Sequence, residues 1–105
     1  MSEDCIFCKI INGDFGTVFV YETENVVVFK DINPKAPVHL LVCPRKHIPS
    51  LIELDDKNLM AELMQAVKDV AKKVGLKAYN VQINTGKDAG QEVMHLHIHV
   101  LGKKA

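Results

Sequence analysis

Residues 95–101, near the C-terminus, read His-Leu-His-Ile-His-Val-Leu, so that histidine alternates with an aliphatic residue. A period of two is typical of a β-strand, whose successive side chains point to opposite faces of a sheet. One face would carry aliphatic residues that pack into a core, namely Leu96, Ile98 and Val100. The other face would present a row of three imidazoles, namely His95, His97 and His99. Because a histidine buried without a partner is costly, this row indicates a chemical use for the second face.

Further segments have the composition of strands. β-Branched and aromatic residues are concentrated in residues 17–22, 26–30, 38–43 and 79–84. The first two segments are close enough along the chain to form a hairpin. Together with the histidine strand, they predict a mostly antiparallel sheet of five strands.

One long helix is predicted between the third and fourth strands. Apolar residues recur at helical spacing from Leu59 to Val74, with Asp55 as a suitable N-cap and Gly75 as a suitable C-terminal stop. A short amphipathic helix over residues 4–11 precedes the first strand. This order of elements indicates an α+β fold in which the long helix covers one face of the sheet.

The composition is that of a single domain, which we expect to span residues 1–105. A formal net charge of zero provides no basic surface for nucleic acid or for an acidic membrane. No apolar run is long enough to cross a bilayer, and the acidic N-terminal residues lack the layout of a signal peptide. Three cysteines, an odd number, favour a reducing compartment, so we expect a cytoplasmic protein.

The histidine row allows three interpretations. In the first, the imidazoles have no task. In the second, they form a mononuclear zinc site, because His-x-His suits tetrahedral zinc. Alternatively, a neutral imidazole can attack phosphorus or carbon and then leave, which divides one difficult step into two. His97 would then be the nucleophile, with one ring nitrogen attacking and the other donating to a fixed acceptor. His95 and His99 would position His97 and transfer protons.

Cys5 and Cys8 form a second candidate site, because two thiolates at this spacing are a common half-site for zinc. The alternative is that they are small buried residues on the short helix, since free cysteine often packs in this way. Cys43 lies on a predicted core strand, where we expect it only to pack.

The histidine strand resembles the His-φ-His-φ-His-φ-φ signature, with φ apolar, of the histidine triad (HIT) family of nucleotide hydrolases and transferases. The resemblance runs nearly from end to end and includes residues 5–14, 29–39, 43–48 and 90–93. The chain is most similar to the purine nucleoside phosphoramidase (histidine-triad nucleotide-binding) branch. The resemblance implies a HIT-like fold and the pairing of two subunits into a homodimer.

The resemblance also implies a mechanism. His97 would attack the α-phosphate of a purine nucleotide, form a nucleotidyl-imidazole intermediate and expel an amine, and water would then release the nucleoside monophosphate. His99 and Asn84 would hold phosphate oxygens, together with main-chain donors near Gln91. His39 would lie beside the triad as a supporting partner.

The nucleoside site carries over from the same resemblance. Asp31 would accept both ribose hydroxyls, although a residue before Asn33-Pro34 is also a natural turn former. Apolar residues would sandwich the purine, unless they are plain core: Phe7, Ile10, Phe15, Phe29 and Ile32.

Zinc-carrying members of the family suggest His47 and His95 as the ligands that would complete a site with Cys5 and Cys8. Such a zinc would be structural, with all four positions filled, and it would remove His95 from the proton-handling group. No cofactor is then required for the chemistry.

Two residues depart from the family pattern, and one of them, Lys30, stands where many members have histidine. Glu92 stands where the eukaryotic phosphoramidases carry a serine, and a carboxylate there would repel phosphate unless it points away. Two other activities stay open within the family, namely hydrolysis of dinucleoside polyphosphates and nucleotidyl transfer. A nucleotide-binding or zinc-stabilised interaction module with incidental hydrolysis is the alternative from another class.

Overall fold

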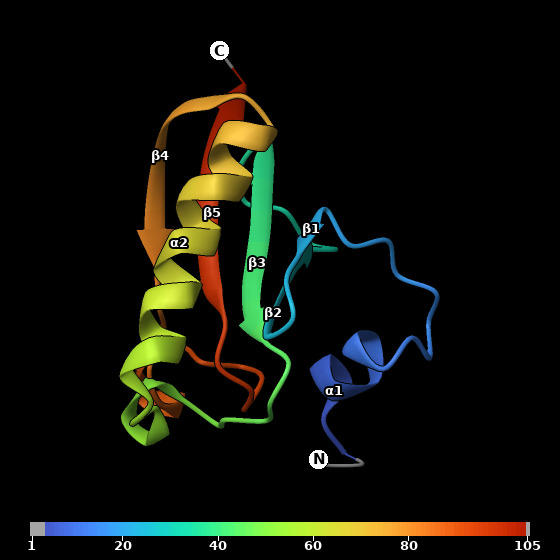
Figure 1. Ribbon diagram of the computed structural model, residues 1–105, viewed down its shortest axis with the longest axis vertical. Coiled ribbons are helices and arrows are strands. Elements are labelled where there is room, and N and C mark those ends of the chain that lie inside the picture. Colours follow the sequence, from blue (N-terminus) through green and yellow to red (C-terminus); the bar gives the residue numbers. More distant parts are fainter. Residues whose placement is uncertain (1–3, 105) are drawn as a thin grey trace.

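The computed structural model describes residues 4–104 and contains a five-stranded sheet of order β1-β2-β3-β5-β4, in which each neighbouring pair is antiparallel (Figure 1). The strands are β1 (Tyr21–Glu22), β2 (Val26–Lys30), β3 (Val38–Pro44), β4 (Leu76–Gln82) and β5 (Ile98–Lys104). Two α-helices accompany them, α1 (Ile6–Ile11) and α2 (Lys57–Lys73), with short 3-10 turns at Leu51–Glu53 and Lys87–Ala89. The predicted α+β fold with one long and one short helix is confirmed.

Helix α2 covers one face of the sheet, and Figure 1 shows it lying across β3, β5 and β4. The main core lies between them and includes the aliphatic residues of the histidine segment, Leu96, Ile98 and Val100. Opposite them, α2 contributes Leu63, Val67 and Val70, which are almost completely buried. Burying each such side chain stabilises the fold by about 2 kcal/mol, so this face anchors the segment that carries the histidines.

Helix α1 packs against the opposite face of the sheet. Its buried residues form a second, smaller core with the strands: Cys5, Phe7, Cys8, Val27, Phe29, Leu41 and Cys43. A six-residue helix is too short to be stable alone in water, so the order of α1 depends on this packing. The position of α1 is therefore set by a few side chains close to the histidines.

The observed strands differ from the predicted ones mainly at the edges of the sheet. The strand at residues 26–30 forms as predicted and pairs with residues 21–22 in a hairpin, whereas residues 17–20 lie outside any strand. Strand β4 begins at Leu76 and ends at Gln82, earlier than the predicted 79–84. Its extent is set by pairing with β5, from Leu76 opposite Lys104, which local composition does not reveal. Among residues 4–104, no helix has the length and hydropathy to span a bilayer.

The predicted N-cap of α2 is wrong by one residue. The side chain of Asp56, not Asp55, accepts the backbone N–H of Leu59 at 3.0 Å. This position suits a cap because the N-cap side chain bonds to an N–H two or three residues further along the helix.

Replacing this cap tests the assignment. We expect Asp56→Ala to lower the free energy of unfolding by about 1 kcal/mol, because one helical N–H loses its partner. Urea denaturation followed by circular dichroism measures the change. Asp55→Ala is the matched control, with an expected change below about 0.5 kcal/mol. Equal losses in the two variants would show that the cap is misassigned.

Candidate active site

A pocket of about 690 Å³ opens on the sheet face that carries the histidines. It is lined from several parts of the chain, which include α1, the segment between β2 and β3, residues 84–93 and β5. The lining includes an apolar group (Phe7, Ile10, Phe29, Ile32, Leu41) and a polar group (Lys30, Asp31, Lys35, His39, Asn84, Glu92, His97, His99). Such a mixture of apolar walls and a few converging polar groups is typical of a small-molecule site.

His97 lies in this pocket with only 7% of its surface exposed. Its Nδ1 is 2.7 Å from the main-chain oxygen of His95. A carbonyl oxygen can only accept, so Nδ1 carries the proton and donates it, and the Nε2 of the neutral ring has a lone pair. The edge-to-face contact of Phe7, with ring centroids 4.9 Å apart, fixes the ring from the side. His97 therefore has the tautomer and the restraint that a nucleophile needs.

The proton positions on His39 and His99 follow from one backbone group. The N–H of Lys35 donates to Nδ1 of His39 at 3.0 Å, so the proton of a neutral His39 is on Nε2. This Nε2 lies 2.9 Å from Nδ1 of His99 and donates to it. The proton of His99 is then on Nε2, as a hydrogen-bond donor beside His97, whose ring centroid is 5.0 Å away.

Burial favours the neutral form of two histidines. The pKa of His99 lies below its ordinary value, mainly because of desolvation and also because of the neighbouring His97 and His39. Desolvation also lowers the pKa of His95, against the opposing effect of its bond to the Pro44 carbonyl. Both rings are therefore neutral at pH 7, in agreement with the single proton that the hydrogen bonds assign to His99.

Asp31 forms a turn and also lines the pocket. Its Oδ1 accepts the N–H of Asn33 at 2.8 Å, which makes the turn after β2. Its Oδ2 lies 3.5 Å from Nε2 of His39, and the residue lines the pocket. A turn-forming carboxylate is thus held at the edge of the histidine group.

The loop before the histidines is held by internal hydrogen bonds. Asn84 donates through Nδ2 to the Ala89 carbonyl at 2.9 Å, while its Oδ1 is buried without a hydrogen-bond partner. Gly90 has φ +90° and lies so close that an added Cβ would be 3.0 Å from Nδ2 of Asn84. One amide hydrogen of Asn84 thus remains for a ligand in the pocket.

Two expected site residues do not line the pocket. The backbone N–H of Gln91, the expected main-chain donor, donates to the Gly86 carbonyl at 3.1 Å. The buried side chain of Gln91 also bonds to its surroundings, because it accepts from Gly86 N–H and donates to the carbonyls of Pro49 and Val93. Phe15 is 59% exposed and lies outside the lining. Sequence reasoning gave no role to Lys35, although its backbone directs the histidine tautomers, because nothing in the residue type indicates a main-chain donor.

His95 does not join the other two histidines of the strand. Its ring is fully buried and lies beside His47, with centroids 5.2 Å apart, whereas His97 and His99 lie together in the pocket. Strand β5 begins only at Ile98, so regular strand geometry does not align all three rings. The expectation that His95 handles protons with His99, and the alternative of one zinc bound by all three histidines, do not agree with this arrangement.

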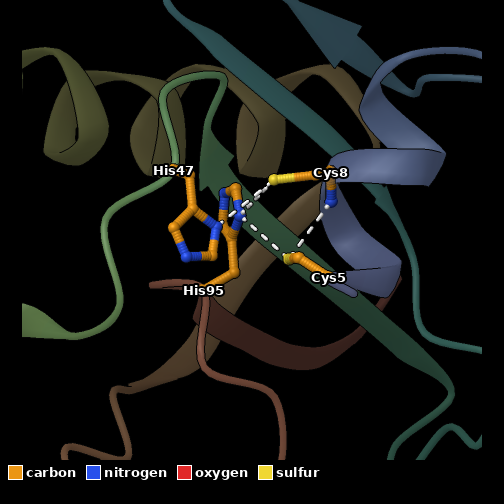
Figure 2. Close-up of side chains that lie close together, drawn as sticks. All are labelled: Cys5, Cys8, His47 and His95. Atoms are coloured by element: carbon orange, nitrogen blue, oxygen red, sulfur yellow. Dashed lines mark hydrogen bonds between the residues drawn. The ribbon is translucent and has the colours of Figure 1, made fainter. Parts of the chain in front are cut away.

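Instead, His95 forms a second group with Cys5, Cys8 and His47, and Figure 2 shows the four side chains converging. Nδ1 of His95 is 3.5 Å from the Sγ atoms of both cysteines, and Nδ1 of His47 is 3.3 Å from Sγ of Cys8. Nε2 of His95 donates to the Pro44 carbonyl at 2.9 Å, which leaves the lone pair on Nδ1, facing the sulfur atoms.

These four residues fit a zinc ion. Bonds of about 2.3 Å to sulfur and 2.0 Å to nitrogen place tetrahedral ligands about 3.5 Å apart, close to the observed separations. The Cys43 thiol is not a member of this group, and burial raises its pKa well above the ordinary value, so it stays protonated in the core.

The neutral state of His99 predicts how stability depends on pH. Above its ordinary pKa of 6.5, the residue is neutral in both the folded and the unfolded chain. As the pH falls below this value, the unfolded chain takes up the proton first, so stability is lost as the pH falls through the lowered folded pKa. We expect the urea midpoint to fall between about pH 7 and pH 5, and to fall less in His99→Gln. Parallel pH profiles for the two proteins would contradict the assignment.

Comparison with known proteins places the chain in a family. The sequence pattern of the HIT domain matches residues 12–105. The chain is 46% identical to Protein HitA of Neisseria gonorrhoeae, over 95% of this chain and 96% of that protein. A histidine triad protein from Clostridium difficile is 44% identical, with a TM-score of 0.91 over 100% of this chain and 96% of the other. A HIT family hydrolase from Legionella pneumophila is 38% identical, with a TM-score of 0.90 over 97% and 95% of the two chains. The fold, the histidine strand and these similarities together show that the chain belongs to the HIT domain family.

Proposed function

We propose that this protein is a nucleotidyl hydrolase that cleaves purine nucleoside 5'-phosphoramidates through a covalent intermediate on His97. The observation that carries the proposal is the 2.7 Å hydrogen bond from Nδ1 of His97 to the His95 carbonyl. It directs the lone pair of Nε2 away from the backbone and leaves it available as a nucleophile.

The histidine tautomers support a balanced two-step reaction. In the first step, Nε2 of His97 forms a bond to the α-phosphorus, the phosphorus–nitrogen bond breaks, and the leaving amine takes up a proton from solvent. In the second step, water attacks phosphorus and loses a proton to solvent, and the electrons of the phosphorus–nitrogen bond return to His97. In both steps the Nε2–H of neutral His99 can donate a hydrogen bond to a phosphate oxygen and stabilise its developing charge. The His95 carbonyl holds the ring of His97, and the Lys35 N–H holds the ring of His39, which in turn donates to His99.

The pocket has the groups that a purine nucleotide needs. Apolar residues on α1 and β2, such as Phe7 and Phe29, form a wall on which a purine can pack. Asp31 can accept from ribose hydroxyls, and the second amide hydrogen of Asn84 can donate to a phosphate oxygen. The ammonium groups of Lys30 and Lys35 offset phosphate charge.

Glu92 favours a phosphoramidate over a dinucleoside polyphosphate. Glu92 lines the same pocket as His97 and Asn84. A carboxylate there repels a leaving group that carries further phosphates, whereas it tolerates or attracts an amine. The alternatives to this function are polyphosphate hydrolysis, nucleotidyl transfer and simple nucleotide binding.

A trapped adduct tests the nucleophile. We expect intact-protein mass spectrometry, after a rapid quench with a slow adenosine phosphoramidate, to show one added adenylyl group. In His97→Ala the adduct should be absent and turnover should fall by about three orders of magnitude or more, because the covalent route is lost. Binding of AMP should persist in the variant.

Each alternative gives a different result in this experiment. Faster turnover of a diadenosine polyphosphate than of the phosphoramidate would favour the polyphosphate hydrolase. Transfer of the adenylyl group to added phosphate would favour the transferase. AMP binding without adduct or turnover in the unaltered protein would leave only the nucleotide-binding module.

We also propose a structural zinc on Cys5, Cys8, His47 and His95. All four donors are protein groups, so no position remains for a reacting water, and the ion supplies cross-linking rather than chemistry. The reaction needs no other cofactor. We also propose a cytoplasmic location, because an odd number of cysteines favours a reducing compartment.

A homodimer is the proposed assembly. Strand β4 forms one edge of the sheet and leaves its backbone groups open to a further strand (Figure 1). Val81 on this strand is 44% exposed, although its partner Val100 is in the core. Pairing of β4 with β4 of a second copy would cover this edge.

Light scattering after gel filtration tests the assembly. We expect a mass of twice 11.7 kDa for the unaltered protein. Val81→Glu should shift the population toward the monomer, because it introduces a charge at the pairing edge. Val18→Glu, near the opposite edge of the sheet, is the control and should leave the mass unchanged. A monomer in all three samples would refute the dimer.

A further inference from the structure

We infer that the group of Cys5, Cys8, His47 and His95 is a positioning device for His97, so that metal binding at this group and nucleotide binding in the pocket strengthen each other. The identity of the nucleotide rests on the proposed function. The coupling itself rests on two physical connections between the two sites.

The first connection is His95, which belongs to both sites. Its imidazole is held at Nε2 by the Pro44 carbonyl and at Nδ1 by the two sulfur atoms (Figure 2). Its main-chain oxygen accepts a hydrogen bond from the Nδ1–H of His97. Any change in how the ring of His95 is held is therefore transmitted through one residue to the group that orients the nucleophile.

The second connection is helix α1. Phe7 stands between the two cysteines in sequence, packs edge-on against His97 and also approaches His95, with centroids 6.1 Å apart. Ile6, Phe7 and Ile10 of this helix line the pocket. The same short helix thus presents two metal ligands to one site and an apolar wall to the other.

Metal binding changes the free energy of this arrangement. A thiol is a weak hydrogen-bond donor, so in the metal-free protein weak contacts join α1 to His47 and His95. Metal–sulfur and metal–nitrogen bonds replace these contacts by a much stronger cross-link, and the binding free energy becomes ordering free energy. The loaded protein therefore has the pocket wall and the His95 carbonyl already in place when a nucleotide arrives.

Thermodynamic linkage makes the inference quantitative. If the metal raises the affinity for a nucleotide by some factor, the nucleotide must raise the affinity for the metal by the same factor. We expect a factor of about ten, within the usual range for coupled sites. If the metal only stabilised the fold, and the nucleotide site were equally ordered without it, the metal would change the nucleotide affinity by a factor near one.

The experiment uses the full chain in two states, metal-free after chelation under reducing conditions and loaded with one equivalent of Zn²⁺. Calorimetry measures the Kd of AMP in each state, and competition with a chromogenic chelator measures the Kd of Zn²⁺ with and without AMP. Both ratios should be about ten and should agree with each other.

Two further measurements do not depend on nucleotide. Long-range ¹⁵N–¹H spectra of the imidazoles should show a narrower, more fully ordered Nδ1–H signal of His97 in the loaded protein than in the metal-free protein. Amide hydrogen exchange of residues 6–11 should be slower when Zn²⁺ is bound.

The variants are chosen to separate coupling from folding. His47→Gln removes one donor from a partly exposed position that does not line the pocket, so it should reproduce the metal-free values. Cys43→Ala is the matched control, because Cys43 packs in the same small core but lies outside the group of four. It should keep the tenfold coupling of the unaltered protein.

Several outcomes overturn the inference. The first is that AMP binds but both Kd ratios are near one. The second is a His97 spectrum that is insensitive to Zn²⁺, and the third is a chain that does not take up Zn²⁺. If AMP binds to neither state, the proposed function fails, and the His97 spectrum together with exchange in α1 then decides the coupling alone.

Discussion

The antiparallel pairing of β3 with β5 is the constraint on which the site depends. It places Leu41 opposite His99 and His39 opposite Leu101, so that histidines from two distant segments meet on one face. The other face of the same pair is covered by α2 through Leu40, Val42, Ile98 and Val100. A shift of this register by one residue would turn the histidines into the apolar core, where they would be buried without partners. The hydrophobic core therefore specifies the position of the polar site.

Main-chain groups then determine the chemistry of each ring. The Pro44 carbonyl, the His95 carbonyl and the Lys35 N–H hold His95, His97 and His39 in single tautomers. Backbone groups suit this task because the surrounding secondary structure holds them rigidly and they do not titrate. The result is an acceptor nitrogen on His97 beside a donor nitrogen on His99, which is the pair of functions that a nucleophilic displacement at phosphorus requires.

The two parts of the histidine segment serve different sites. His97 and His99 face the pocket, whereas the ring of His95 lies among the cysteines and leaves only its carbonyl to the pocket. The alternation correctly indicates the face of each side chain, but it does not indicate which neighbouring side chains each histidine meets on that face. That position depends on which neighbours come from β3, from α1 and from residues 44–48. Gln91 and Phe15 differ from expectation for the same reason, because motif position does not reveal whether a side chain turns into its own loop or toward solvent.

The sequence by itself determined the fold class, the family and the core face of the histidine strand. Local periodicity and chain order are sufficient for the fold class and the core face, since apolar side chains must be buried and a strand has a period of two. The family followed instead from the resemblance of the chain's motifs to those of known members. The sequence also indicated Cys5 and Cys8 as a half-site. The resemblance suggested His47 and His95 as their partners, and the tertiary structure brings the four side chains together. Only the tertiary structure decided which nitrogen of each histidine carries the proton. It also showed that Phe7 connects the two groups. These features depend on distances of a few ångströms between residues far apart in the chain, and no local pattern encodes such distances.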